Sequence, residues 1–159
     1  MKRPWNIINT PVYSLQTCDN SENVNMNICT YVTAVSMKPK IYAIAIDYKT
    51  KTFENLKYTN QAVLQILSLE NIKIIKKLGK TSGFKLDKNK FLQKNNLLQN
   101  WKDEKVLTNA CAFLKLDKRL CIEDHGDHAI FLFDVISSKT VSENNILTFQ
   151  DLVENKIIL

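Results

Sequence analysis

Four residues of the kinds that bind phosphate stand together in the sequence: Lys49, Thr50, Lys51 and Thr52. They precede a short helical pattern that runs to about Thr59. The first turn of a helix presents unpaired N–H groups and the positive end of its dipole. Lysines and threonine hydroxyls around such an end predict a phosphate site. One threonine could instead only cap the helix, and capping and phosphate binding can coexist.

A second polar group comprises His125 and His128 with Asp124 and Asp127. These residue types bind metals, but here they fall in a predicted hairpin turn, where acidic residues are favoured because they hydrogen-bond the backbone. The sequence holds no further histidine to complete a site. We therefore expect no metal.

Other catalytic signatures are absent. The sequence has no Gly-x-Ser-x-Gly, His-Glu-x-x-His or Walker motif. Its three glycines are too few for a dinucleotide-binding Rossmann loop. Any NAD(P)H must therefore bind transiently over another cofactor. The four cysteines form no Cys-x-x-Cys pair, so we expect free thiols rather than a zinc site or a disulfide framework.

The residues before the phosphate pattern predict two strands joined by a tight turn at Lys38-Pro39. Residues 28–37 are rich in β-branched and aromatic types. Residues 41–46 alternate between a small face, which includes Ala43 and Ala45, and a larger face, which includes Ile44 and Ile46. A small-residue face allows either a flat ligand to approach or a helix to pack closely, and the spacing alone leaves both open.

These segments resemble the flavin reductase-like family, the FMN-binding split barrels, and in particular its flavoredoxin-like branch. Seven segments in the family's order carry the resemblance: Arg3-Pro4-Trp5 with Pro11-Val12-Tyr13-Ser14; Met26-Asn27-Ile28-Cys29; Val35-Ser36-Met37-Lys38-Pro39; Ala43-Ile44-Ala45-Ile46; Lys49-Thr50-Lys51-Thr52; Gly79-Lys80-Thr81-Ser82-Gly83 with Asp87-Lys88; and Gly126-Asp127-His128-Ala129-Ile130-Phe131. They cover most of the chain.

The resemblance implies an FMN site and a role for each matching residue. The flavin ring and ribityl chain would be lined by Met26, Asn27, Ile28, Cys29, Thr30, Ser36 and Met37. Lys49, Lys51 and Thr52 match the phosphate end, and Ser82 and Gly83 match a loop that in many relatives comes from the partner subunit. His128 matches the position beside the flavin and the incoming nicotinamide, which makes it the candidate catalytic residue.

The chain departs from the family's pattern at three positions. Asn27 and Cys29 stand where many members carry Thr and Ser, and Gln65 stands where Asn is common. The first two changes lie at the expected flavin, so the reduction potential and the substrate could differ from those of standard reductases. Cys29 could be a redox thiol or a close-packed small residue.

The remaining pattern predicts a mainly β fold with α insertions in a single domain spanning residues 1–159. The resemblance sharpens this to a six-stranded antiparallel Greek-key split barrel that forms a homodimer with flavin at the subunit interface. The elements expected in chain order are an extended arm (1–17), strands at 27–37 and 41–46, a helix at 53–59, a strand at 62–67, helices at 70–78 and 87–98, a hairpin of 112–122 with 129–137, and a short strand or helix after 147. Gly79 is expected just after the end of the 70–78 helix.

In the predicted hairpin strand at 112–122, apolar and polar residues alternate. The even-numbered positions hold the apolar residues Ala112, Leu114, Leu116, Leu120 and Ile122. One face of this strand is therefore expected to be buried and the other wet.

Composition limits the class of protein. Of 159 residues, 45% are hydrophobic and 24% charged, as in ordinary globular chains. No apolar run could span a membrane and no signal-peptide pattern begins the chain, so we expect a cytoplasmic protein without membrane contact. The net charge of +6 comes almost wholly from scattered lysine, with Arg3 and Arg119 as the only arginines, which argues against nucleic-acid binding.

Three functions remain compatible with the sequence. The first is an FMN-dependent oxidoreductase, an NAD(P)H flavin reductase that passes electrons to a small-molecule or protein acceptor. The second is a flavoredoxin-like electron carrier that does not react with nicotinamide. The third is a non-enzymatic basic binding module, which would not be yellow.

Overall fold

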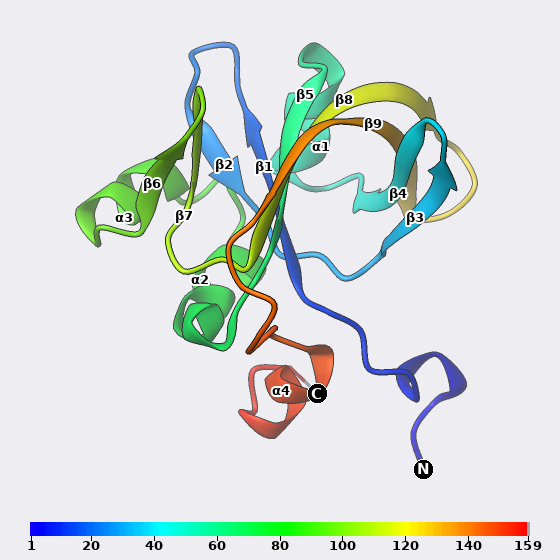
Figure 1. Ribbon diagram of the computed structural model, residues 1–159, viewed down its shortest axis with the longest axis vertical. Helices are drawn as coiled ribbons and strands as arrows, with labels where there is room; N and C mark the ends of the chain where they lie inside the picture. Colours follow the sequence, from blue (N-terminus) through cyan, green and yellow to red (C-terminus); the bar gives the residue numbers. More distant parts are fainter. Residues whose placement is uncertain (159) are drawn as a thin grey trace.

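Seven antiparallel strands form one strongly curved sheet in the order β2-β1-β5-β8-β9-β4-β3 (Figure 1). The computed structural model describes residues 1–158. The strands are β1 (Tyr13–Cys18), β2 (Val24–Met26), β3 (Val32–Met37), β4 (Lys40–Asp47), β5 (Gln61–Ile66), β8 (Ala112–Ile122) and β9 (His128–Thr140). A separate two-stranded sheet pairs β6 (Leu98–Trp101) with β7 (Glu104–Leu107).

Short helices connect and flank the strands. They are η1 (Pro4–Asn6), α1 (Lys51–Tyr58), η2 (Leu69–Ile74), α2 (Ile75–Lys80), α3 (Lys88–Lys94) and α4 (Phe149–Glu154). Among the described residues, no helix has the length and apolar character needed to cross a membrane.

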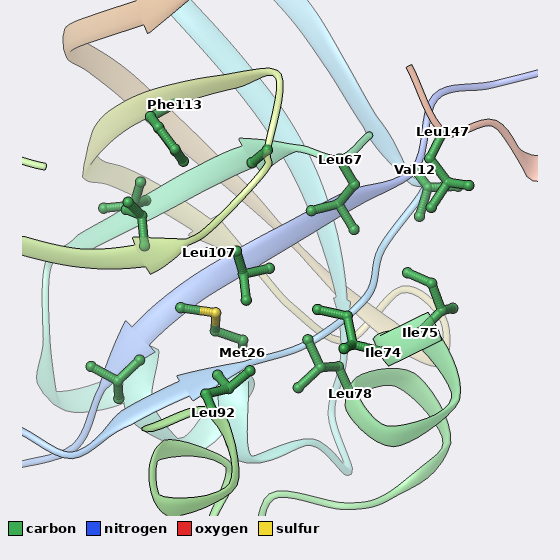
Figure 2. Packing of buried hydrophobic residues seen from close by; sticks show 14 of the residues in the cluster. Val12, Met26, Leu67, Ile74, Ile75, Leu78, Leu92, Leu107, Phe113 and Leu147 are labelled. Atoms are coloured by element: carbon green, nitrogen blue, oxygen red, sulfur yellow. The ribbon is translucent and has the colours of Figure 1, made fainter. Parts of the chain in front are cut away.

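Two apolar cores lie on opposite faces of the sheet. The inner core is enclosed by the curved strands and α1, and it contains Leu15, Ile44, Ile46, Phe53, Leu56, Ala62, Leu64, Leu114, Leu116, Ala129, Phe131 and Phe133. The helix-side core joins the other face to α2, α3, α4 and the β6–β7 hairpin. Figure 2 shows Met26 in this second core, among Leu78, Leu92 and Leu107. Each fully buried leucine or phenylalanine contributes about 1.5–3 kcal/mol of apolar transfer energy.

The mainly β class with a few helices is as predicted, but the strand count is wrong. Instead of six strands the chain has a seven-stranded sheet plus a two-stranded one. Of the strands that were not expected, β1 has six residues and lies in the expected extended arm, whereas β2, β6 and β7 have only three or four residues each. So few residues do not establish an alternation in the sequence, because period 2 needs several repeats to be distinguished.

Several element boundaries also differ from the prediction. The expected arm at residues 1–17 contains β1, an internal strand between β2 and β5, while Trp5, Ile7 and Ile8 are exposed. The expected strand at 27–37 is β3 alone, because β2 ends at Met26. The expected helix at 87–98 ends at Lys94, and residues 98–101 are β6.

Gly79 lies inside α2 rather than after it. A β-carbon there would stand 3.2 Å from the side chain of Ile28, so the glycine permits close packing of α2 on the segment after β2.

The predicted hairpin is confirmed as β8 and β9, and its inner half has the expected parity. Ala112, Leu114 and Leu116 are buried. Leu120 and Ile122, expected to be buried as well, are 48% and 37% exposed. The pairing register shifts between Lys118 and Leu120, so Leu120 and Ile122 lie on the outer face of the sheet, whereas their neighbour Cys121 packs against the inner core.

Gln65 of β5 connects the two sheets. Its side chain is fully buried, and its Oε1 accepts a hydrogen bond of 2.7 Å from the N–H of Leu107 in β7. Because methionine has a similar shape and no comparable acceptor, Gln65→Met leaves that buried N–H unpaired. We expect its free energy of unfolding to fall by about 1–3 kcal/mol in a denaturant titration. Gln61→Met, at the exposed start of the same strand, is the control, and equal stability of the two variants would refute this role.

Candidate functional site

A cleft of about 370 Å³ lies where four segments meet. It is bounded by residues 25–31 at the end of β2 and after it, by the end of β4 with the start of α1, by the end of α2 with the loop that follows, and by the first residue of β9, and Lys88 of α3 also lines it. The lining residues are Asn25, Asn27, Ile28, Cys29, Thr30, Tyr31, Ala45, Ile46, Asp47, Lys49, Thr50, Lys51, Thr52, Leu78, Gly79, Lys80, Thr81, Ser82, Gly83, Lys88 and His128. Its volume is in the range of small-molecule and cofactor sites.

The segment after β2 presents free hydrogen-bond donors to this cleft. Cys29 exchanges two backbone hydrogen bonds of 2.9 Å with Tyr13, and the Asn27 Oδ1 accepts from the N–H of Leu15 at 2.9 Å. These bonds hold the segment along β1. The N–H groups of Ile28 and Thr30 have no acceptor within residues 1–158. A polar ligand in the cleft can accept from both.

The start of α1 presents two more unpaired donors. Thr50 is the helix cap, since its Oγ1 accepts from the N–H of Phe53 at 3.2 Å. The N–H groups of Lys51 and Thr52 find no acceptor in the described part of the chain. The Thr52 side chain is buried, and its hydroxyl accepts from the Asn25 amide at 3.2 Å. This end of the cleft therefore combines free N–H groups with a positive dipole end, which favours an anion.

The lysines at this end are arranged unequally. Lys51 forms an ion pair of 3.3 Å with Glu54, and its ammonium lies 5.3 Å from the centre of the Phe84 ring. Lys49 and Lys80 are exposed at the rim and form no ion pair with any described residue. Lys51 is therefore partly committed within the protein, whereas the other two are free to meet a ligand.

The loop after α2 closes against the start of α1 at Gly83. A β-carbon at this glycine would lie 2.3 Å from the Asn25 Oδ1 and 2.8 Å from the Lys51 Cβ. No other residue type fits without movement of its neighbours. The neighbouring Ser82 hydroxyl accepts from the N–H of Phe84 at 3.2 Å, which shapes the turn that follows.

His128 lies at the rim of the cleft, paired in register with Asp47. Its Nδ1 is 2.6 Å from the Asp127 Oδ1, and its ring centre is 5.4 Å from that of Tyr31 in an edge contact. Hydrogen bonding to His128 lowers the pKa of Asp127, which is therefore ionised at neutral pH. An ionised carboxylate only accepts, so Nδ1 donates to it and Nε2 is left for a ligand.

The Cys29 thiol does not have the properties of a redox thiol. Burial raises its pKa to about 12, so the thiol stays protonated at neutral pH and is a poor nucleophile. The structure favours the interpretation of Cys29 as a small packing residue in the wall of the cleft.

Ten of the thirteen predicted site residues line this cleft: Asn27, Ile28, Cys29, Thr30, Lys49, Lys51, Thr52, Ser82, Gly83 and His128. The other three lie elsewhere. The Met26 side chain is in the helix-side core, and Ser36 and Met37 lie at the far end of β3, where Met37 is 77% exposed.

The lining also includes polar residues that were not among the predicted site residues, namely Asn25, Tyr31, Asp47, Lys80, Thr81 and Lys88. Asn25 and Lys88 are buried. Burial of a polar side chain leaves no periodic signal in a sequence. Tyr31 could have been found, since it directly follows the predicted flavin segment.

Known proteins resemble this chain in sequence pattern and in fold. The chain matches the model of the flavin reductase like domain over residues 5–153. No curated protein matches it.

Among solved structures, the FMN-binding protein from Thermus thermophilus with bound 1-cyclohex-2-enone has a TM-score of 0.74 and 18% identity, over 88% of this chain and 75% of that one. Flavoredoxin from Methanosarcina acetivorans has a TM-score of 0.74 and 16% identity, over 91% and 75%. The NADH:FAD oxidoreductase SgcE6 from Streptomyces globisporus, in complex with NAD and FAD fragments, has a TM-score of 0.70 and 18% identity, over 84% and 76%. At these identities the likeness concerns the fold.

Proposed function

Because the chain belongs to the flavin reductase like domain family, we propose that it is an FMN-binding oxidoreductase that is reduced by NAD(P)H. The electrons pass on to free flavin or to another small-molecule or protein acceptor. The observation that carries this proposal is the cleft itself, which has unpaired backbone donors along one wall and an anion-binding helix start at one end.

The residues of the cleft fit a flavin mononucleotide. Flavin needs N–H donors near its ring heteroatoms and an apolar wall for its hydrocarbon edge. The N–H groups of Ile28 and Thr30 supply the former, and the side chain of Ile28 supplies the latter. The phosphate fits the free N–H groups of Lys51 and Thr52.

Bound FMN supplies hydride acceptance and one- or two-electron release, and the protein supplies binding and orientation. The Nε2 of His128 faces whatever enters over the rim, where it can hydrogen-bond a carbonyl or an anionic group. The nearby Tyr31 ring keeps the imidazole in place by an edge contact. Because the chain lacks a dinucleotide fold of its own, the nicotinamide binds only for the duration of hydride transfer.

Two solved structures support this assignment by what they contain. One is an FMN-binding protein with an enone bound, and the other is an NADH:FAD oxidoreductase with NAD and FAD fragments. Both proteins are named for a flavin, and we propose that this chain binds one as well.

Anaerobic mixing with NADH and with NADPH tests the function directly. Purified protein reconstituted with FMN should be yellow and should bleach with at least one of the two nucleotides. Protein that binds FMN but bleaches with neither would instead support the electron-carrier function, as in flavoredoxin. Protein that binds no FMN would contradict both.

We further propose that the protein is a homodimer with the flavin at the subunit interface. On the outer face of the sheet, Ile122 pairs with Ile130 and Leu120 pairs with Leu132, so these four side chains lie together. Leu120, Ile122 and Ile130 are 37–48% exposed. Ile130 is also paired with Ala45, which lines the cleft. A partner seated on this apolar face would therefore reach the edge of the flavin site.

Ile130→Lys should separate the two subunits, because it places a charge in the centre of the exposed apolar face. In sedimentation velocity we expect a dimer for the wild type and a monomer for this variant. Val141→Lys is the control, since Val141 is similarly exposed but lies beyond the end of β9. A wild-type monomer that binds FMN tightly would refute the dimer.

A further inference from the structure

Lys88 is the one lysine of the described chain that is buried. It is the first residue of α3 and is only 5% exposed. Its ammonium donates to the carbonyl of Leu78 at 2.7 Å and to that of Met26 at 2.9 Å. An ammonium has three N–H donors, so one is left without a partner among the described residues.

No carboxylate within residues 1–158 forms an ion pair with Lys88. The acidic side chains that could serve as a counter-charge for Lys88 already have other partners. Asp87 caps α3 by accepting from the N–H of Lys90 at 3.0 Å, and Glu54 pairs with Lys51. Asp19, across the neighbouring cavity, accepts two N–H groups of its own loop.

Asp47, at the end of β4, lines the same cleft and accepts from the N–H of Lys49 at 2.8 Å. The remaining charged side chains that share a cavity with Lys88 are the cations Lys49, Lys51, Lys80 and Lys85. Burying an ammonium without a counter-charge is strongly unfavourable, because the charge loses its hydration. Lys88 therefore lacks a counter-charge from the chain itself.

Lys88 also lies at the junction of two cavities. It lines the 370 Å³ cleft and a neighbouring cavity of about 320 Å³, and the two share only Asn25, Lys51, Gly83 and Lys88. The same junction holds the start of α1, with the free N–H groups of Lys51 and Thr52. An anion placed there would meet the helix start and the ammonium together.

We propose that Lys88 is the buried cation that pairs with the phosphoryl group of bound FMN, to which its third N–H donates. The inference rests on the proposed function and adds a specific phosphate ligand to it. The two carbonyls fix the ammonium, and the ligand supplies the missing negative charge. Lys51, which the sequence predicts at the phosphate end together with Lys49 and Thr52, forms an ion pair with Glu54 and lies near the Phe84 ring.

The proposal predicts how FMN affinity depends on pH. Burial lowers the pKa of Lys88 to about 8 in the free protein. A bound phosphate dianion favours the charged ammonium and so raises this pKa. Below pH 8 the Lys88 ammonium is therefore already charged and attracts the phosphate. Above pH 8 Lys88 is mostly neutral in the free protein, so it must take up a proton when FMN binds. FMN should bind roughly tenfold more weakly at pH 9 than at pH 7.

The experiment compares FMN with riboflavin, which lacks the phosphate, by quenching of flavin fluorescence at pH 7 and at pH 9. A phosphate monoester is largely dianionic across this range because its second pKa is about 6. We expect the affinity for FMN to fall and that for riboflavin to stay level. Lys88→Met should weaken FMN roughly ten- to a hundredfold at pH 7 and abolish the difference between the two pH values. Lys94→Met, at an exposed lysine that ends the same helix and lines neither cavity, is the matched control and should behave as the wild type.

Each result has a distinct meaning. If neither flavin binds at any pH, the proposed function fails. If both flavins bind with the same pH dependence, Lys88 only joins β2 to α2 and the phosphate assignment is overturned. The wild-type comparison decides this even if Lys88→Met does not fold.

Discussion

His128→Ala is expected to retain FMN but to lose roughly tenfold or more in the rate of NAD(P)H-driven bleaching. The side chain lies at the rim of the cleft, where it contacts Asp127 and Tyr31 rather than the flavin-binding wall. Hydride transfer requires the nicotinamide carbon to lie about 3–3.5 Å from the flavin nitrogen. Loss of a positioning group at the rim should therefore slow reduction much more than it weakens FMN binding.

Anaerobic stopped-flow measurement of flavin absorbance, with FMN affinity determined in parallel, tests this expectation. His125→Ala is the matched control, because His125 is in the same turn, is exposed and does not line the cleft. Bleaching of His128→Ala at the wild-type rate would mean that the histidine is only a turn residue. A parallel loss of FMN would assign it to flavin binding instead.

The sequence located most of this cleft because the relevant residues lie in short, contiguous segments. Residues 27–30 and 49–52 each contribute a run of neighbours to the lining, and both runs carry distinctive side chains or a helix start. Local chemistry of this kind is visible without a fold. The capping geometry of Thr50 is likewise a local property, and it coexists with free N–H groups at the next two residues.

The sequence could not show the hydrogen bonds of polar side chains that are buried by tertiary packing. Asp87-Lys88 belongs to a segment that carries the family resemblance, but Lys88 follows an acidic cap and begins a surface helix, so nothing in the sequence indicates that it is buried. Only the packing of α3 on β2 places it within reach of the Met26 carbonyl. For the same reason the buried Gln65 gives no sequence signal of the hydrogen bond that connects the two sheets.

The strand count was wrong for a related reason. β1 lies in a stretch whose asparagines and prolines resemble a loop, yet it pairs with both β2 and β5. Tertiary pairing outweighs the weak local preference of such short strands. The outer half of β8 shows the opposite case, in which a clear apolar parity persists at Leu120 and Ile122 although these side chains are exposed. An apolar pattern identifies side chains that avoid water. Before the register shift at Lys118 these side chains lie in the inner core, and after it they lie on the outer face, where in our proposal a second subunit covers them.

Gly83→Ala is expected to weaken FMN binding by about 1–3 kcal/mol, the usual cost of overpacking a close contact. The added methyl group would lie 2.3 Å from the Asn25 Oδ1 and 2.8 Å from the Lys51 Cβ. Either the loop must withdraw from α1 or Asn25 must move. Movement of Asn25 breaks its hydrogen bond to the buried Thr52 hydroxyl, at the helix start proposed to hold the phosphate.

Gly126→Ala gives a close control for this prediction. It is the same substitution, but a β-carbon at Gly126 meets nothing within 4 Å, so FMN affinity should be unchanged. Fluorescence titration with FMN measures both variants, and thermal unfolding without flavin shows whether Gly83→Ala disturbs the whole fold or only the cleft. Because the contact joins a surface loop to one helix start, we expect the loss to be larger in FMN affinity than in stability. Equal FMN affinity of the two variants would show that the loop can withdraw freely, and that the contact at Gly83 does not shape the phosphate end of the site.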